Sequence, residues 1–207
     1  MSPLARRTRR PAGAGRGVAA AALAVASALA VAGCTGGVAA STPASNGQSF
    51  VAGNPGTTVF KSGTGPVAPS VSGPAVGGGK LALTAYRGHV VVLNFWGSWC
   101  TPCREEAPDL AALATHFKAS GVRFLGIDIR DSAPNAEAFM SNFRISYPSL
   151  NDPSDNLALD FRNTVPPAGI PTTLVISRSG RITARVIGEA TYDGLKTLVQ
   201  RAAAEPG

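Results

Sequence analysis

The sequence contains only two histidines and three cysteines among its 207 residues. A structural zinc site takes four ligands, usually as two closely spaced pairs. Cys100 and Cys103 form one such pair, but His89 and His116 do not form a second one. This shortage excludes a zinc finger and predicts that the protein holds no metal.

Basic residues outnumber acidic ones mainly because of the first few positions. The net charge is +7, from 19 Lys and Arg against 12 Asp and Glu. Five arginines precede Val18, so that 19 less 5 leaves 14 basic residues against 12 acidic ones in the rest of the chain. Nucleic-acid binding needs clustered Lys and Arg. With a remaining balance of +2 and no basic patch, we expect no nucleic-acid partner.

The sequence also lacks an apolar run of the length that spans a bilayer, about 20 residues. The apolar stretch at 18–33 is shorter and contains Ser27 as its only polar side chain. An arginine-rich start followed by such a stretch is typical of a secretory signal peptide. We therefore predict a signal peptide at 1–33 and export of the rest of the chain.

The end of this stretch, Val31-Ala32-Gly33-Cys34, resembles the lipobox of bacterial lipoproteins, whose signal is cut before a cysteine that carries diacylglycerol. The resemblance implies that lipid on Cys34 anchors the protein to the outer face of the bacterial cell membrane. It also accounts for the third cysteine, which would otherwise be an unpaired thiol in an oxidising compartment. The alternative is an ordinary signal peptide cut after Ala40, which would discard Cys34.

Residues 34–79 are rich in Gly, Ser, Thr and Pro and show little hydrophobic periodicity. Such a segment buries too little apolar surface to offset the entropy lost on ordering. We predict a flexible tether at 34–79 and one folded domain at 80–207.

Hydrophobic patterning within 80–207 predicts an α/β domain. The run at 90–96 is nearly continuously apolar, which is typical of a central strand buried on both faces. Pro102 suits the first turn of a helix that follows it and ends near Gly121. The other predicted elements are a strand at 122–128, a helix over 136–143, a short strand at 147–150, a short helix at 157–161, a hairpin at 172–176 and 182–187, and a closing helix over 195–202. This order predicts parallel strand pairing first and antiparallel pairing last.

Cys100 and Cys103 lie where the predicted central strand gives way to a helix. A cysteine at a helix N-terminus has a lowered thiol pKa, because unpaired N–H groups and the helix dipole stabilise the thiolate. Cys100 is placed for this effect at the helix mouth, and Cys103 is tucked beneath it. A structural disulfide of this spacing would close too small a loop to stabilise the fold much. We therefore predict that Cys100 attacks a partner sulfur and that Cys103 resolves the mixed disulfide.

The segment 94–108 (NFWGSWCTPCREEAP), followed some seventy residues later by 170–174 (IPTTL), resembles the TlpA/ResA branch of the thioredoxin-like family. The resemblance covers roughly 79–204. It implies a thioredoxin-like α/β fold with a mixed central β-sheet flanked by helices. It also implies an extracytoplasmic thiol-disulfide oxidoreductase that needs no cofactor beyond its redox-active Cys100–Cys103 disulfide.

The resemblance assigns a role to a late proline. Pro171 matches the family's cis-proline, which packs against the cysteine pair. The carbonyl of the preceding residue, Ile170, is then free to pair with the backbone of a client protein. We expect one tryptophan of the motif, Trp96, in the core, and the other, Trp99, shielding the disulfide or touching the client.

The resemblance also assigns a proton acceptor. Glu106 matches the family's active-site glutamate near the buried sulfur of Cys103. Asn94 stands where thioredoxin itself has a buried aspartate, which leaves Glu106 to accept the Cys103 proton. The alternative for Glu106 is an ordinary first-turn acid, which is favourable at any helix N-terminus.

These features predict an exported, membrane-tethered oxidoreductase that exchanges its dithiol with thiol- or disulfide-bearing exported proteins. A membrane electron donor or acceptor of the DsbD/CcdA or quinone-linked kind would complete the cycle. The resemblance implies reduction of clients, for example in cytochrome c maturation, and the alternative is a disulfide-forming oxidant of secreted proteins. A thiol peroxidase is disfavoured because peroxiredoxins carry Thr or Ser where Gly97 stands. A copper chaperone of this fold needs a wider cysteine spacing and a late histidine, whereas no histidine follows His116.

Overall fold

The computed structural model describes residues 48–50, 56–166 and 169–206. The predicted signal peptide, Cys34 and the first part of the predicted tether lie outside these ranges, apart from 48–50. Among the helices within them, none combines the length and the apolar character that crossing a bilayer requires.

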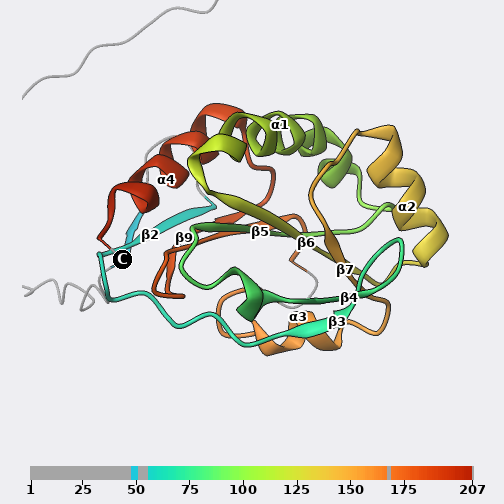
Figure 1. Cartoon of the computed structure of the whole chain (residues 1–207), viewed down its shortest axis with the longest axis horizontal. Helices are drawn as coiled ribbons and strands as arrows, with labels where there is room; N and C mark the ends of the chain where they lie inside the picture. Colours follow the sequence, from blue (N-terminus) through green and yellow to red (C-terminus); the bar gives the residue numbers. More distant parts are fainter. Residues whose placement is uncertain (1–47, 51–55, 167–168, 207) are drawn as a thin grey trace, which may run out of the picture. The chain divides into compact units, whose positions relative to one another are not determined.

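A seven-stranded mixed sheet forms the centre of the domain, and a two-stranded hairpin lies beside it (Figure 1). The strands are β1 (Gln48–Phe50), β2 (Thr57–Phe60), β3 (Ser72–Pro74), β4 (Lys80–Ala82), β5 (Val91–Trp96), β6 (Arg123–Ile129), β7 (Ser149–Asp152), β8 (Thr172–Ile176) and β9 (Ile182–Ile187). Their order in the sheet is β1-β2-β9-β8-β5-β6-β7, with β3 and β4 paired separately. β5, β6 and β7 pair in parallel, whereas β8 is antiparallel to both β5 and β9. This confirms the predicted order of parallel and antiparallel pairing.

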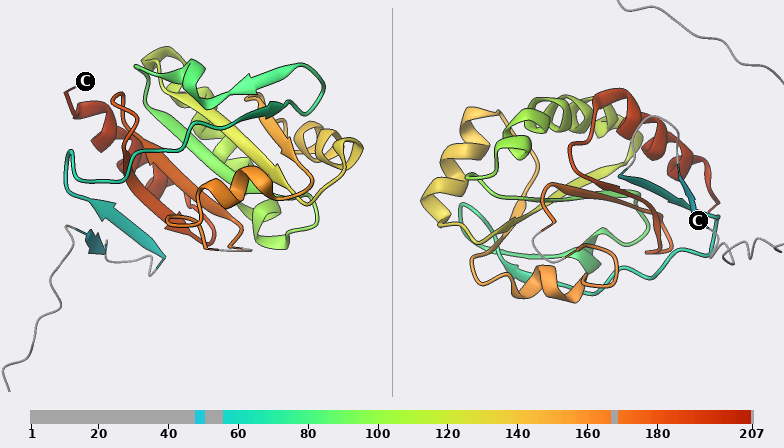
Figure 2. Two further views of the ribbon diagram at one scale, coloured as in Figure 1. Left: turned by 90° about the horizontal axis from the view of Figure 1, so that it is seen from below. Right: turned by 180° about the vertical axis from the view of Figure 1, so that it is seen from behind.

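Helices cover both faces of the sheet (Figures 1 and 2). They are α1 (Thr101–Phe117), α2 (Ala133–Asn142), α3 (Asn156–Asp160) and α4 (Tyr192–Ala204), with 3-10 turns η1 (Leu83–Tyr86) and η2 (Lys118–Ser120). α1 and α4 lie over one face, and α3 and the β3–β4 hairpin lie over the other. A mixed sheet flanked by helices is the thioredoxin-like architecture that the sequence resemblance implies.

The side chains of β5 alternate between these two layers, which explains why the strand is apolar almost throughout. Val92 packs with buried side chains of α1 and α4, whereas Leu93 and Phe95 pack with those of the opposite face. Asn94 projects to the same side as Val92 and is 3% exposed. The strand therefore places a buried amide beneath α1.

The folded domain begins earlier than the sequence predicts. The prediction of a tether up to Gly79 is wrong for residues 56–79, which the structure packs onto the domain. β2 pairs antiparallel with β9, and Val59 and Phe60 are buried, one in each of the two main core clusters. Val71 is also buried, and its carbonyl accepts a hydrogen bond from Leu83 N–H at 2.9 Å. Single apolar residues in this Gly- and Pro-rich segment are buried against the sheet that the segment joins. The segment is therefore ordered although its own sequence shows no hydrophobic periodicity.

The same N-terminal segment reaches both outer strands of the sheet core. At one edge β2 lies against β9, and β1 lies against β2. At the other edge Ala75 forms a bridge with Leu150 in β7, and Val76 N–H donates to the carbonyl of Ser149 at 2.9 Å. The chain from 56 to 76 thus runs across one face of the sheet, from one edge to the other.

Candidate active site

Cys100 and Cys103 form a disulfide at the N-terminus of α1, directly after β5. Their Cα atoms are 5.3 Å apart. Cys100 is the N-cap residue, and its Sγ accepts a hydrogen bond from Cys103 N–H at 3.2 Å. A backbone donor therefore already points at the sulfur that would carry negative charge in the reduced protein.

The two sulfur-bearing residues differ little in exposure while they are bonded. Cys100 is 5% exposed and Cys103 is 1% exposed. The predicted order holds, with Cys100 at the helix mouth and Cys103 beneath it, but Cys100 is less open to solvent than the sequence suggested. Ile170 and the α2 side chain Phe139 belong to the apolar cluster that encloses the pair. A client sulfur therefore has a narrow approach to Cys100.

Residues 97–100, which lead from β5 into the disulfide and include Cys100, form what we call the redox loop. Ser98 N–H donates to Asp131 Oδ2 at 2.7 Å, and Arg104 Nη1 donates to the Ser98 carbonyl at 2.9 Å. Trp99 is 53% exposed, with Arg130 stacked 5.3 Å from its ring centre. The loop is therefore held from the connection between β6 and α2, and it presents an exposed aromatic side chain beside the disulfide.

The two tryptophans divide as predicted. Trp96 is 2% exposed, stacks on Phe139 with ring centres 4.4 Å apart, and donates from Nε1 to Ser149 Oγ at 3.3 Å. Trp99 lies at the surface, and its Nε1 donates to the Ile129 carbonyl at 3.4 Å. The core position of Trp96 is thereby confirmed, and Trp99 is available to a partner.

Glu106 is a buried carboxyl group one turn after Cys103 on the same face of α1, because residues three apart are neighbours on a helix. It is 1% exposed. Its Oε1 accepts from Asn94 Nδ2 at 2.7 Å, and its Oε2 accepts from Ala190 N–H at 2.8 Å. Burial raises the pKa of Glu106 from 4.5 to about 8, although both hydrogen bonds oppose this effect. A surface acid of the first helical turn would not be enclosed in this way.

Asn94 connects Glu106 to the neighbouring strand. Its Nδ2 also donates to Thr173 Oγ1 in β8, at 3.0 Å. The amide is thus fixed between two acceptors, and it fixes one oxygen of Glu106 in turn. The sequence indicated that Asn94 leaves the proton to Glu106, but it did not show that the two side chains touch.

The Ile170–Pro171 peptide bond is cis, as the resemblance implies. The Pro171 carbonyl accepts from Gly188 N–H at 2.9 Å, and Thr172 Oγ1 donates to the Gly169 carbonyl at 2.6 Å. Within the part of the chain that the structure describes, neither the N–H nor the C=O of Ile170 has a hydrogen-bond partner. Ile170 packs against the cluster that contains both cysteines. An unpaired peptide group therefore lies next to the redox pair.

Two aspartates near the redox loop escaped the sequence analysis. Asp128 lies near the carboxyl end of β6, which is parallel to β5, and Asp131 comes two residues after this strand ends. Parallel strands bring their carboxyl ends to the same edge of a sheet, and the redox loop starts from that edge. Pairing an acid-rich strand end with the motif-bearing strand is a signal that could have found them. No group of three or more His, Cys, Asp or Glu side chains in the described ranges is arranged to hold a metal ion.

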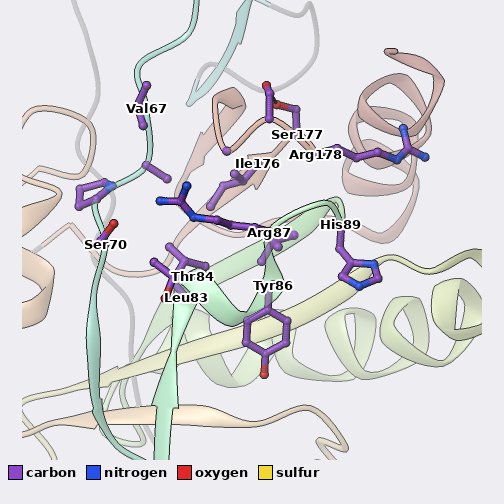
Figure 3. A pocket seen from close by; sticks show the side chains of 15 residues that line it. Val67, Ser70, Leu83, Thr84, Tyr86, Arg87, His89, Ile176, Ser177 and Arg178 are labelled. Carbon is purple, nitrogen blue, oxygen red and sulfur yellow. Dashed lines mark hydrogen bonds between the residues drawn. The ribbon is translucent and has the colours of Figure 1, made fainter. Parts of the chain in front are cut away.

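A surface pocket of about 140 Å³ lies away from the redox pair, between residues 67–70, η1 and the β8–β9 turn (Figure 3). Two of its basic side chains already have backbone partners. Arg178 donates to the carbonyls of Ala203 and Glu205, and His89 Nδ1 lies 3.0 Å from the Gly121 carbonyl. None of the predicted site residues lines the pocket, and we assign it no role in the chemistry.

Comparison with known proteins places the chain in a family. A model of the AhpC/TSA family matches residues 64–185, which is more than half of the chain. The chain belongs to the AhpC/TSA family. The match begins well before Gly79, in agreement with the early start of the folded domain.

Two curated relatives of this AhpC/TSA chain carry names that state a chemistry. ResA from Bacillus subtilis, a thiol-disulfide oxidoreductase, is 33% identical over 114 residues, which are 55% of this chain and 62% of ResA. HelX from Rhodobacter capsulatus, a thiol:disulfide interchange protein, is 36% identical over 107 residues, which are 51% of this chain and 56% of HelX. The chain spans less than two thirds of the length of these relatives.

Solved structures share the fold over more of the chain. A secreted thiol-disulfide isomerase from Corynebacterium glutamicum is 28% identical, with a TM-score of 0.69 over 77% of this chain and all of that one. A DsbF homologue from Corynebacterium diphtheriae is 29% identical, with a TM-score of 0.67 over 74% of this chain and 98% of that one. These names agree with the chemistry that Cys100, Cys103 and the Ile170 peptide group can perform.

Proposed function

We propose that this AhpC/TSA family member is a thiol-disulfide oxidoreductase that reduces disulfides of exported proteins, tethered to the outer face of the cell membrane by lipid on Cys34. The observation that carries the proposal is the geometry at Cys100. Its sulfur caps α1 and is bonded to Cys103, with the unpaired Ile170 peptide group in the adjoining cluster. This arrangement supplies a stabilised thiolate, a resolving thiol and a docking edge for a client backbone.

The exchange cycle begins with both cysteines reduced. The Cys100 thiolate attacks one sulfur of a client disulfide, and the other client sulfur leaves as a thiolate that takes up a proton. Cys103 then loses its proton and attacks Cys100 Sγ, which releases the second client thiol. The client gains two electrons and two protons, and the enzyme ends with the Cys100–Cys103 disulfide. A membrane dithiol donor of the DsbD/CcdA kind would return the electrons.

Glu106 suits the proton transfer that the second step requires. A group with a pKa of about 8 lies close to the ordinary thiol value of about 8.5, so that a proton can move from Cys103 to Glu106 with little change in free energy. Only the ionised form of Glu106 can accept a proton; it is the minor form at neutral pH, and its fraction grows as pH rises toward 8. Its negative charge would raise the pKa of a nearby thiol, in opposition to the helix terminus.

The client is expected to bind as an extended segment beside the cis-proline. The N–H and C=O of Ile170 can pair with a client backbone in the manner of an added β-strand. Trp99, half-exposed within the redox loop, offers an aromatic surface to the same segment. Backbone pairing makes few demands on client sequence, which suits an enzyme that acts on several proteins.

Oxidation of secreted proteins is the second candidate function, because the Cys100–Cys103 disulfide present in the structure is the species that an oxidant would pass to a client dithiol. The direction of exchange depends on the reduction potential, which spans about −270 to −120 mV among related motifs. A peroxidase would need a hydroxyl side chain at position 97. There Gly97 lies so close to the Trp99 indole that an added Cβ would come within 2.7 Å of Nε1.

The reduction potential of the Cys100–Cys103 pair tests the proposal. We expect a value below about −200 mV when the protein is equilibrated with thiol buffers, as for reducing members of the fold. A value near −120 mV would replace the proposal by the oxidant. Incorporation of labelled fatty acid into the wild type but not into Cys34→Ser, in the native host, tests the anchor separately.

A further inference from the structure

The exchange cycle leaves unused a pair of buried carboxyl groups beneath the redox loop. Asp128 is the strand partner of Trp96 at the ends of β6 and β5, and it is 0% exposed. Asp131 follows in the connection to α2 and is 8% exposed. Both lie at the sheet edge from which the redox loop starts. Burying an acid without an opposite charge costs free energy, so the contacts that compensate for this cost are informative.

Asp131 ties the redox loop to the start of α2. Its Oδ2 accepts from Ser98 N–H at 2.7 Å, and its Oδ1 accepts from Ser132 N–H at 2.8 Å. Ser132 is the N-cap residue of α2, and Ser98 lies two residues ahead of Cys100. A hydrogen bond to an ionised acceptor is about twice as strong as a neutral one. Asp131 therefore fixes the loop backbone close to the attacking sulfur.

The side chains of Asp128 and Asp131 can form a hydrogen bond with each other only when one of them is protonated. Its Oδ2 accepts from Asn151 Nδ2 at 3.0 Å, whereas its Oδ1 is buried without any donor. Its side chain also lies within hydrogen-bonding reach of Asp131. Two carboxylates are both acceptors, so this contact becomes a hydrogen bond only when one of them carries a proton.

The charges around Asp128 favour a proton on that side chain. Burial, and after it the charge of Asp131, raise the pKa of Asp128 to about 7, and Asp152 on β7 acts in the same direction. The nearby cation, Arg130, is engaged elsewhere, over the Trp99 ring and 3.6 Å from Asp155. The partners that β5 and β7 contribute at this point, Trp96 and Asn151, are uncharged.

We propose that Asp131 is a positioning residue for the redox loop and that the proton on Asp128 determines how firmly Asp131 holds Ser98. When that proton is lost to solvent, two buried negative groups face each other. Asp128 is fixed in β6 and by Asn151, so Asp131, in a connecting segment, moves away. Ser98 N–H then loses its acceptor, and the loop loosens.

This inference rests on the proposed exchange chemistry only for its functional consequence. A loosened redox loop aligns Cys100 less well with a client sulfur, and the extra negative charge disfavours its thiolate. The first effect slows the attack of each Cys100 thiolate above neutral pH, and the second lowers the fraction of Cys100 that is present as thiolate. The pair therefore makes exchange responsive to acidity outside the cytoplasm.

The test follows the Ser98 amide by NMR in the ¹⁵N-labelled full chain, with the disulfide oxidised so that neither Cys100 nor Cys103 titrates. Between pH 5.5 and 8.5 we expect its shift to titrate near pH 7 and its hydrogen-exchange protection factor to fall at least tenfold. Asp128→Asn keeps a donor toward Asp131 at every pH, so the titration of the Ser98 shift should vanish and the Ser98 amide should stay protected from hydrogen exchange. Asp131→Asn should lower protection at least tenfold at every pH. Asp160→Asn, which removes an exposed charge, should behave as the wild type.

A second measurement tests whether the hydrogen bond between Ser98 N–H and Asp131 affects the reactivity of Cys100. In the reduced protein, Asp131→Asn should slow alkylation of Cys100 by iodoacetamide at least threefold per thiolate, whereas Asp128→Asn should abolish the slowing above neutral pH. A Ser98 titration that survives in Asp128→Asn, or full protection and reactivity in Asp131→Asn, would overturn the inference. If the amide behaves as expected while the wild type exchanges no disulfide, the inference on the loop stands and the proposed function fails.

Discussion

The buried carboxyl group of Glu106 makes a quantitative prediction about stability and pH. In the unfolded chain its pKa is near 4.5, and in the folded protein burial raises it to about 8. The folded state therefore binds the proton more tightly than the unfolded state. At about 1.4 kcal/mol per pH unit, the difference between these two pKa values corresponds to roughly 5 kcal/mol of unfolding free energy.

Because the pKa of Glu106 is raised on folding, the unfolding free energy falls as pH rises. Below pH 4.5 both states are protonated and the contribution is complete. Between pH 4.5 and 8 the folded state retains a proton that the unfolded state has released, so stability falls as pH rises. Above about pH 8 both states are ionised and the loss is complete. Between pH 5 and 9 the wild type should lose about 4 kcal/mol through Glu106 alone, a large part of the usual 5–15 kcal/mol.

Glu106→Gln removes this dependence and adds a constant cost. A glutamine side chain has one carbonyl oxygen, whereas Asn94 Nδ2 and Ala190 N–H both need an acceptor. One unsatisfied donor costs about 1–3 kcal/mol at any pH. The variant should therefore be less stable than the wild type at pH 5 and at least as stable at pH 9.

The assay is urea unfolding of the oxidised protein at pH 5, 7 and 9, followed by fluorescence and circular dichroism. Subtracting the two unfolding free energies cancels other titrating groups, including Asp128. Glu105→Gln removes an exposed charge from the neighbouring position and serves as the matched control, with a curve parallel to the wild type. Parallel curves for Glu106→Gln as well would refute the view that this carboxyl group is neutral in the folded protein at pH 7.

Three further predictions concern reactivity, packing and client binding. Cys100→Ser should abolish reduction of insulin disulfides, whereas Cys103→Ser should accumulate client proteins as mixed disulfides on non-reducing gels; activity that survives the first change would mean that the nucleophile is another group. Val59→Ala should lower the unfolding free energy by about 1–3 kcal/mol, because a core contact is lost, whereas Val67→Ala, at a position 62% exposed, should change it by less than about 0.5 kcal/mol. Trp99→Ala should raise KM for a protein client several-fold and leave the unfolding free energy within about 1 kcal/mol, since half of the ring is exposed; an unchanged KM would remove Trp99 from the client surface.

The sequence predicts best those elements whose residues are buried on both sides. The β8–β9 hairpin has the predicted bounds, and β5 and β6 begin within one residue of the predicted starts, because continuous apolar runs mark strands enclosed by two layers. β7 and α3 are displaced by one or two residues. There the carboxylate of Asp152 accepts the N–H groups of Asn156, Leu157 and Ala158 and so fixes the start of the helix, which apolar patterning does not register.

The site is predictable where a motif is contiguous and unpredictable where it depends on distant pairing. Cys100 and Cys103 were identified by their spacing, and the cis bond before Pro171 by resemblance. The contact of Glu106 with the N–H of Ala190, 84 residues away, follows from the packing of α1 beside α4 and has no local signature. β2 was missed for a similar reason, because four residues gain their stability only from the edge that β9 provides.

The path of residues 56–76 has a practical consequence for the protein's solubility. Backbone groups along a sheet edge attract other strands, and an uncovered edge is a site of aggregation. Here one short segment covers β9 with β2 and engages β7 through Ala75 and Val76. A shortened protein that starts at residue 80 would retain the whole CxxC motif and yet expose both borders at once, so it should self-associate where the longer chain stays dispersed.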